Sequence, residues 1–162
     1  MILPKPMIKR KIAHIGNSLS QFYAMNMIVI GQSSFKFASE LYSTMPNNVE
    51  SVSILEPYLE NDGSIFFSGG FCADLNNKVN LLVHSACDTG YMYSETHKKI
   101  TSEFPDAIIK NVCMVNKTFG RALDFHTDYS VIDIESDIFV VGYGIGIENE
   151  YRELESLFEL FY

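Results

Sequence analysis

The 162-residue sequence lacks several features that mark specialised protein classes. No apolar run approaches the roughly 20 residues that span a bilayer, and the basic segment at residues 1–11 lacks the apolar stretch of a secretory signal. The three cysteines, Cys72, Cys87 and Cys113, include no CxxC pair that would suggest a metal or redox motif. We therefore expect a cytoplasmic protein without a membrane partner, whose cysteines are reduced and buried.

Basic residues are also scarce, with 12 Lys and Arg against 20 Asp and Glu and a formal net charge of −8. Proteins that bind DNA or RNA along its backbone need clustered lysines and arginines. Bulk nucleic acid is therefore excluded as a partner. A local anion site is compatible with this charge, because helix N-termini and backbone N–H groups bind anions without contributing to it.

Short apolar runs alternate with amphipathic stretches along the chain. This alternation predicts a single α/β domain over residues 1–162, with a parallel, Rossmann-like sheet and helices on both faces. We expect helices at residues 8–23, 35–45, 89–104 and 148–158, and strands at residues 27–31, 49–56, 79–84, 107–115, 129–134 and 138–146.

Residues 57–77 fit neither period, so we expect a long excursion that forms a small hood over one end of the sheet. In open parallel sheets the ligand lies at the carboxyl ends of the strands. We therefore expect Gly31, His84, Asn116 and Gly142, which follow or end four predicted strands, to lie near one edge.

The turn Asp88-Thr89-Gly90 follows the strand that we expect to end at His84, and it leads into a helix. Such a turn presents free N–H groups, and its glycine allows close approach of an anion. The alternative is that Asp88 or Thr89 only caps the helix. His84 and Cys87 have an H-x-x-C spacing, but no further ligands accompany them, so we expect no metal site.

Four segments together resemble the hypoxanthine-guanine phosphoribosyltransferases. Residues 138–154, IFVVGYGIGIENEYREL, are similar to the family's FVVGYALDYNEYFRDL. Residues 81–95 contain a strand followed by Asp-Thr-Gly, residues 29–41 a strand followed by a polar turn and a helix, and residues 112–118 a strand ending in Val-Asn-Lys-Thr. The resemblance implies the type I phosphoribosyltransferase fold, a nucleotide or phosphoribosyl ligand, and a homodimer.

The resemblance also implies a role for individual residues. Asp88 matches the general base at purine N7, and the phosphate loop would be Asp88, Thr89, Gly90, Tyr91 and Met92. The purine would contact Asn116, Phe139 and Val140. The pyrophosphate side would be formed by Gln32, Ser33 and Arg152.

Several positions depart from the family pattern. His84 and Ser85 stand where the family has two acids, and Gly146 stands where it has an aspartate near magnesium. Met92 replaces a threonine, while Gln32 and Asn116 each replace a lysine. We therefore expect a phosphoribosyltransferase-like protein that binds a purine nucleotide or related phosphorylated ligand, without a cofactor and with lost or strongly altered transferase activity. One alternative is an active purine salvage transferase that uses magnesium, and a second is a non-catalytic protein-interaction scaffold.

Overall fold

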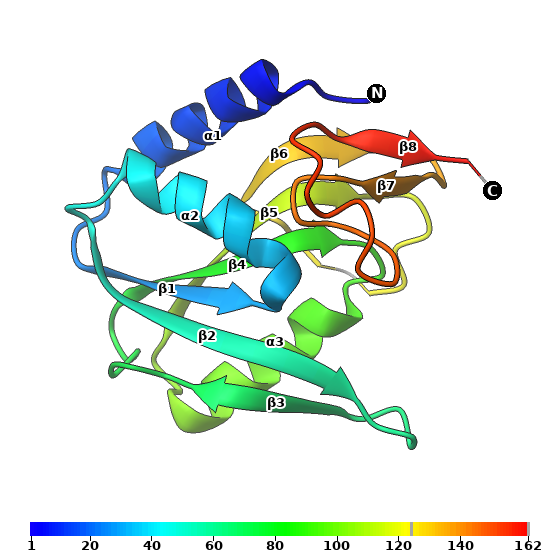
Figure 1. Ribbon diagram of the computed structural model, residues 1–162. Coiled ribbons are helices and arrows are strands. Elements are labelled where there is room, and N and C mark those ends of the chain that lie inside the picture. The colour runs from blue at the N-terminus through cyan, green and yellow to red at the C-terminus, as the bar shows by residue number, and fades with distance from the viewer. Residues whose placement is uncertain (124, 162) are drawn as a thin grey trace.

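The computed structural model describes residues 1–123 and 125–161. Its centre is a six-stranded sheet of order β3-β2-β1-β4-β5-β6, beside a two-stranded sheet of β7 and β8 (Figure 1). The helices are α1 (Lys5–Leu19), α2 (Phe35–Thr44) and α3 (Tyr91–Glu103), and the short 3-10 helix η1 (Gln32–Ser34) precedes α2. The strands are β1 (Met25–Ile30), β2 (Val49–Leu59), β3 (Ile65–Gly70), β4 (Val79–Cys87), β5 (Ile108–Lys117), β6 (Tyr129–Ile134), β7 (Phe139–Val141) and β8 (Phe158–Leu160).

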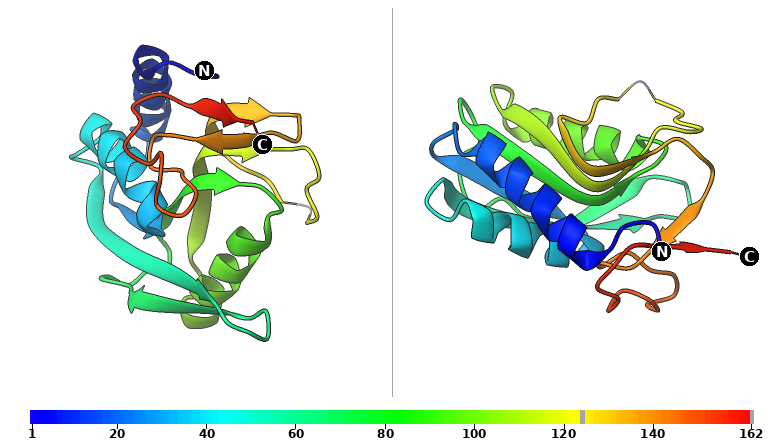
Figure 2. Two further views of the ribbon diagram at one scale, coloured as in Figure 1. Left: turned by 45° about the vertical axis from the view of Figure 1, so that its right-hand side comes forward. Right: turned by 90° about the horizontal axis from the view of Figure 1, so that it is seen from above.

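Strands β2, β1, β4, β5 and β6 are neighbours in this order and pair in parallel, whereas β3 is antiparallel to β2. Helices α1 and α2 cover one face of this sheet and α3 lies on the other, as both views of Figure 2 show. The predicted α/β class, with a mostly parallel sheet between helices, is confirmed. In the described part of the chain, no helix is long and apolar enough to cross a bilayer.

Alternating residues of β1 explain why its sequence reads as one continuous apolar run. Met27 and Val29 belong to the core beneath α1 and α2, while Ile28 and Ile30 belong to the core beneath α3. All four side chains are buried. A strand with helices on both faces is mostly apolar, and the apolar run from Met27 is the pattern from which the strand was predicted. Asn26 is the buried polar exception, and its amide is hydrogen-bonded.

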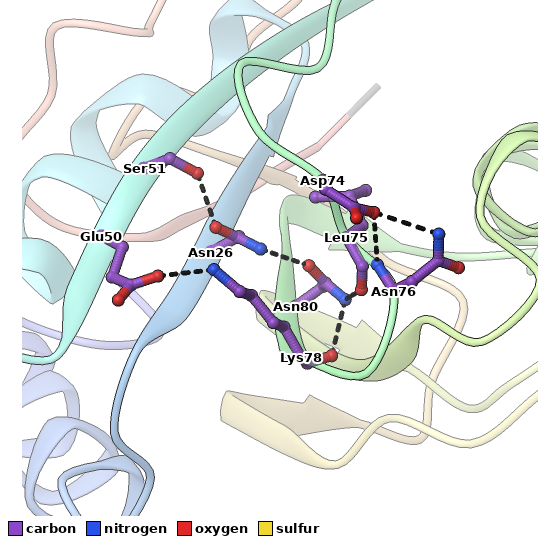
Figure 3. Close-up of polar contacts among 8 residues, drawn as sticks. All are labelled: Asn26, Glu50, Ser51, Asp74, Leu75, Asn76, Lys78 and Asn80. Atoms are coloured by element: carbon purple, nitrogen blue, oxygen red, sulfur yellow. Dashed lines mark hydrogen bonds and ion pairs between the residues drawn. The ribbon is translucent and has the colours of Figure 1, made fainter.

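A polar network joins the amino-terminal parts of β1, β2 and β4 (Figure 3). These strands are parallel, so the network lies at the end of the sheet opposite to the predicted ligand edge. The Asn26 side chain donates to Asn80 Oδ1 at 2.9 Å and accepts from Ser51 Oγ at 2.7 Å. Asn80 in turn donates to the carbonyl oxygens of Leu75 at 3.0 Å and Lys78 at 2.8 Å. Asn26 and Asn80 are register partners of β1 and β4, so this network ties the pairing of the two strands to specific side chains.

The predicted excursion over residues 57–77 is largely a β-hairpin. Strand β2 continues through Pro57 to Leu59, and β3 returns antiparallel to it, with Leu59 paired to Ile65. Pro57 is accommodated within β2, opposite Phe67, because a strand tolerates proline where no ladder N–H is needed. Gly63, with a φ of 86°, lies in the turn between the two strands.

The predicted C-terminal helix over residues 148–158 is wrong. Glu148, Asn149 and Tyr151 have positive φ values, which a right-handed helix excludes. The chain instead forms turns and then β8, which pairs with β7, while Leu157 bonds the backbone of Leu3. The leucines of this segment are spaced as on one face of a helix. In the structure Leu157 instead forms a β-bridge with Leu3, and the residues after it form β8.

The expectation for the cysteines holds for two of the three. All are free thiols, and Cys87 and Cys113 are buried. Cys72 is exposed, because it follows the edge strand β3 rather than lying within the core.

Candidate active site at the carboxyl edge of the sheet

The turn after β1 and the last part of β4 meet at the carboxyl edge of the sheet. Val29 of β1 pairs with Val83 of β4, which places Gly31 and His84 at neighbouring positions of that edge. Both residues line a cavity of about 290 Å³. The prediction that they lie together is confirmed. The cavity is also lined by Gln32, Ser33, Met92 and Arg152 from the predicted sites, and by Ser85.

Three serines fasten the β1 turn to β4. Ser33 Oγ lies 2.8 Å from Ser85 Oγ, and the Ser85 backbone N–H donates to Ser34 Oγ at 2.9 Å. The Ser34 hydroxyl donates in turn to the carbonyl oxygen of Ile30. Gly31 has a φ of 71°, in the left-handed region where glycine is favoured, and this lets the chain turn sharply from β1 into η1. The turn after β1, which lines the cavity, is therefore fixed to β4 by side-chain hydrogen bonds.

Glu56 is a cavity residue that the sequence reasoning missed. Its Oε2 accepts the backbone N–H of Gln32 at 2.8 Å, and it faces the same cavity as Arg152. A signal was present, because Glu56 ends the strand predicted over residues 49–56, as His84 ends the strand predicted over residues 79–84. The carboxyl ends of parallel strands share one edge.

His84 does not lie at the end of a strand. Strand β4 continues to Cys87, and the His84 ring stacks on Tyr93 of α3, with 3.7 Å between ring centroids. Burial, with a smaller contribution from the nearby His97, lowers the pKa of His84 to about 3. Its Nε2 atom is buried and has no hydrogen-bond partner among the described residues. His84 is therefore a neutral core histidine. It provides no charge at its position, which is one of the two that are acids in the family it resembles.

Neither a metal centre nor a thiolate nucleophile is formed around His84. Within residues 1–123 and 125–161, no three His, Cys, Asp or Glu side chains are grouped to hold a metal ion. Burial raises the pKa of the Cys87 thiol. A raised pKa keeps the thiol protonated, so Cys87 is not an activated nucleophile.

The Asp88-Thr89-Gly90 turn has the geometry of a strand-to-helix connection. Gly90 adopts a left-handed conformation with a φ of 86°, and α3 begins at Tyr91. Thr89 Oγ1 accepts the N–H of Tyr91 at 3.3 Å within the turn, but the N-cap of α3 is Gly90 and no described side chain caps this helix. Met92, one residue after Tyr91, reaches the cavity. The turn thus adjoins the cavity and opens at its helix N-terminus.

Asp88 is paired with a lysine from the neighbouring strand. Lys117 Nζ lies 2.8 Å from Asp88 Oδ2, and the Lys117 side chain is 13% exposed whereas that of Asp88 is 54% exposed. Asn116 points elsewhere, because its Nδ2 donates to Asp133 at 2.7 Å. The cation beside the predicted base therefore comes from residue 117 and not from the predicted purine contact at residue 116.

Arg121 holds the connection after β5 against this edge. Its Nη2 donates to Asn116 Oδ1 at 2.6 Å and to the Lys117 carbonyl oxygen at 2.7 Å, and its Nη1 donates to the Phe125 carbonyl oxygen at 3.0 Å. The sequence reasoning also missed this arginine. It lies in a connection without a strand or helix pattern, and only the folded chain brings it back to the end of β5.

The remaining predicted residues belong to the C-terminal segment. Phe139 and Val140 lie on β7, where Phe139 is 38% exposed and Val140 is buried. Gly146 has no space for a side chain, since an added Cβ would lie 2.0 Å from the Glu150 carbonyl oxygen and 2.7 Å from Arg152 Cγ. The chain has thus closed over the position at which the family carries an aspartate.

Comparison with known proteins gives full-length matches of low identity. No family model matches the chain. The hypoxanthine-guanine phosphoribosyltransferase of Dictyostelium discoideum is 25% identical over 171 residues, which cover 99% of this chain and 94% of that protein. The enzyme of the same name from Streptococcus pneumoniae is 28% identical over 150 residues, which cover 86% of this chain and 81% of that protein.

The fold likeness extends to solved structures. The hypoxanthine phosphoribosyltransferase of Trypanosoma cruzi, in complex with the product IMP, superposes with a TM-score of 0.87 at 20% identity over 99% of this chain and 93% of that chain. These neighbours identify the type I phosphoribosyltransferase fold and a likeness to the hypoxanthine-guanine enzymes.

The expectation of a nucleotide-binding protein with lost transferase activity is wrong. The relatives that match over most of their own length carry the name of the transferase, and they favour the alternative of an active purine salvage enzyme. The replaced side chains misled because each charge was required at the family's own position in the sequence. In the folded chain Glu56 and Lys117 bring charged groups to the same edge from neighbouring positions.

Proposed function

We propose that this chain, which has the type I phosphoribosyltransferase fold of its relatives, is an active purine salvage enzyme. It would join hypoxanthine or guanine to the ribose of phosphoribosyl pyrophosphate, with formation of a nucleoside monophosphate and release of pyrophosphate. The observation that carries this proposal is the Asp88–Lys117 pair at 2.8 Å, at the end of the turn that leads into α3. It combines a partly exposed carboxylate with a largely buried cation.

The Asp88 carboxylate would take the proton from purine N7 as the bond to the ribose carbon forms. A general base must lie within hydrogen-bond reach of the proton that it accepts, and the 54% exposure of Asp88 leaves it accessible to a base bound at this edge. Lys117 would hold Asp88 in place and offer its remaining N–H donors to the purine oxygen. Phe139 and Val140 are proposed to contact the purine ring from β7, while Asn116 supports the edge through Asp133.

The ribose phosphate would bind at the turn that runs from Asp88 to Met92. Backbone N–H groups at the start of α3 favour an anion there, and Gly90 permits close approach. The leaving pyrophosphate would lie in the 290 Å³ cavity beside Gln32, Ser33 and Arg152. Arg152 supplies the positive charge that a departing anion requires.

Magnesium is part of this proposal, and the residues of the cavity fit a metal that arrives with its substrate. Magnesium keeps several waters and binds through one or two carboxylates plus substrate phosphates. Glu56 is a carboxylate that lines the cavity. When bound, the metal would neutralise charge on the leaving pyrophosphate.

Two coarser features complete the proposal. We infer a cytoplasmic setting, supported by three free cysteines. We also infer a homodimer, supported by partly exposed apolar side chains over α2 and β2, namely Phe35, Tyr42, Val52 and Ile54. Light scattering behind a size-exclusion column tests the dimer.

The activity is tested by incubating the protein with hypoxanthine or guanine, phosphoribosyl pyrophosphate and magnesium, and by following nucleotide formation. We expect turnover, and a loss of about 10²–10⁴-fold in Asp88→Asn if Asp88 is the general base. Asp62→Asn, at the tip of the β2–β3 hairpin, is the matched control and should keep parental activity. Absence of nucleotide formation by the folded parent with either base would refute the proposal.

A further inference from the structure

The Glu56 carboxylate accepts a hydrogen bond from a backbone N–H group beside the cavity. Its Oε2 accepts the Gln32 N–H at 2.8 Å, at a turn opened by the left-handed Gly31. Backbone N–H groups in such turns are donors for anionic ligands. An oxygen of a protein carboxylate therefore sits where an oxygen of a phosphate group would be expected to bind.

The charges that line the cavity are balanced before any ligand enters. Glu56 and Arg152 are its two charged lining residues within the described chain. Arg152 Nε is buried and has no hydrogen-bond partner among the described residues. No ion pair joins Glu56 to Arg152 within the described residues. A free diphosphate would thus be attracted by one group and repelled by the other.

A bound divalent cation reverses the effect of Glu56. A carboxylate repels the phosphate oxygens directly, but it attracts a magnesium ion that those oxygens already hold. When bound, the ion would offset the repulsion between the Glu56 carboxylate and the phosphate oxygens. The same side chain would therefore oppose the free anion and favour its metal complex.

We propose that Glu56 is the residue that makes this cavity select a diphosphate group as its magnesium complex. It does so by competing with the free anion for the Gln32 amide and by contributing a carboxylate ligand to the metal of the complex. The inference rests on the proposed function for the identity of the anion. Position 56 takes over, from β2, a charge that positions 84, 85 and 146 do not supply.

Calorimetric titration of pyrophosphate, with and without excess magnesium, tests the inference on the parent and on Glu56→Gln. Glutamine keeps an acceptor oxygen for the Gln32 N–H and removes only the charge. Glu60→Gln, an exposed change directly after the same strand, is the matched control. Thermal unfolding of each variant verifies that it is folded.

We expect magnesium to strengthen pyrophosphate binding by about tenfold or more in the parent and in Glu60→Gln. In Glu56→Gln, metal-free pyrophosphate should bind more tightly than in the parent, and the gain from magnesium should fall below about threefold. A Glu56→Gln variant that keeps the parental gain would overturn the inference. So would a parent that binds pyrophosphate equally with and without magnesium, or not at all.

The outcome is independent of the transferase assay. A parent that shows the Glu56-dependent magnesium effect but forms no nucleotide would refute the proposed function and leave this inference standing. An active parent whose Glu56→Gln variant keeps the full magnesium gain would refute the inference alone.

Discussion

Protonation of His84 should make the protein sensitive to mild acid. Burial lowers the pKa of His84 from its ordinary value of 6.5 to about 3 in the folded state. The unfolded chain therefore binds a proton below pH 6.5 that the folded chain refuses. The stabilising effect is fully present above pH 6.5 and is lost progressively as the pH falls from 6.5 toward 3.

The size of the effect follows from the two pKa values. Between pH 7.5 and pH 5 the proton taken up by the unfolded state should cost about 2 kcal/mol of folding free energy. For a chain of 162 residues this corresponds to a fall of roughly 4–8 °C in Tm. Other groups titrate in the same range, so the contribution of His84 has to be isolated by comparison with a variant.

Urea unfolding of the parent and of His84→Phe at both pH values provides that comparison. Phenylalanine retains a ring against Tyr93 and has no titratable nitrogen. The parent should lose about 2 kcal/mol more than His84→Phe on going from pH 7.5 to pH 5. His14→Gln, an exposed change on α1, should behave as the parent does. Equal losses in the parent and His84→Phe would refute the account of a buried neutral histidine.

Three further predictions concern the active-site edge. Gly146→Asp restores the family's acid, and its Cβ would meet the Glu150 carbonyl oxygen at 2.0 Å. This variant should lower the free energy of unfolding, measured in urea, by about 1–3 kcal/mol or more. Unchanged stability would show that the segment rearranges freely. Gly90→Val should abolish stabilisation by nucleoside monophosphates in a thermal-shift assay, because β-branched residues disfavour a φ of 86°. A folded variant that binds like the parent would exclude the turn as the phosphate site. Lys117→Met should weaken purine nucleotide binding by about tenfold or more through loss of a charged hydrogen bond at Asp88, and calorimetry showing parental affinity would remove Lys117 from the site.

The parts of the fold predicted from sequence are those in which periodicity and packing agree. Strand β1 was recognised because a strand buried on both faces is continuously apolar, and α2 because its apolar residues recur at helical spacing before Pro46. The C-terminal segment was assigned wrongly because its leucines and glutamates imitate a helical stripe. Glu148 and Asn149 instead adopt positive φ in a tight turn, which is closed by the bridge between Ile147 and Glu150.

The candidate site divides in the same way. Gly31 and His84 were expected together because strand ends of a parallel sheet coincide, and the cavity contains both. Arg121 was not found, because its contacts depend on the path of the chain after β5. Lys117 follows Asn116 at the end of a predicted strand, but the sequence alone does not show which of the two adjacent side chains reaches Asp88.

The polar network of Asn26 and Asn80 has a consequence for laboratory evolution of this protein. Both amides are fully buried, and a slip of β4 along β1 would leave them unpaired. The side chains that fix strand alignment thus lie at the amino-terminal end of the sheet, away from the residues proposed to contact ligand. Libraries that randomise positions 88–92 and 118–121, which lie outside the paired strands β4 and β5, can therefore vary the proposed ligand edge while strand alignment is maintained independently. A library that includes positions 26 and 80 should yield mostly misfolded clones.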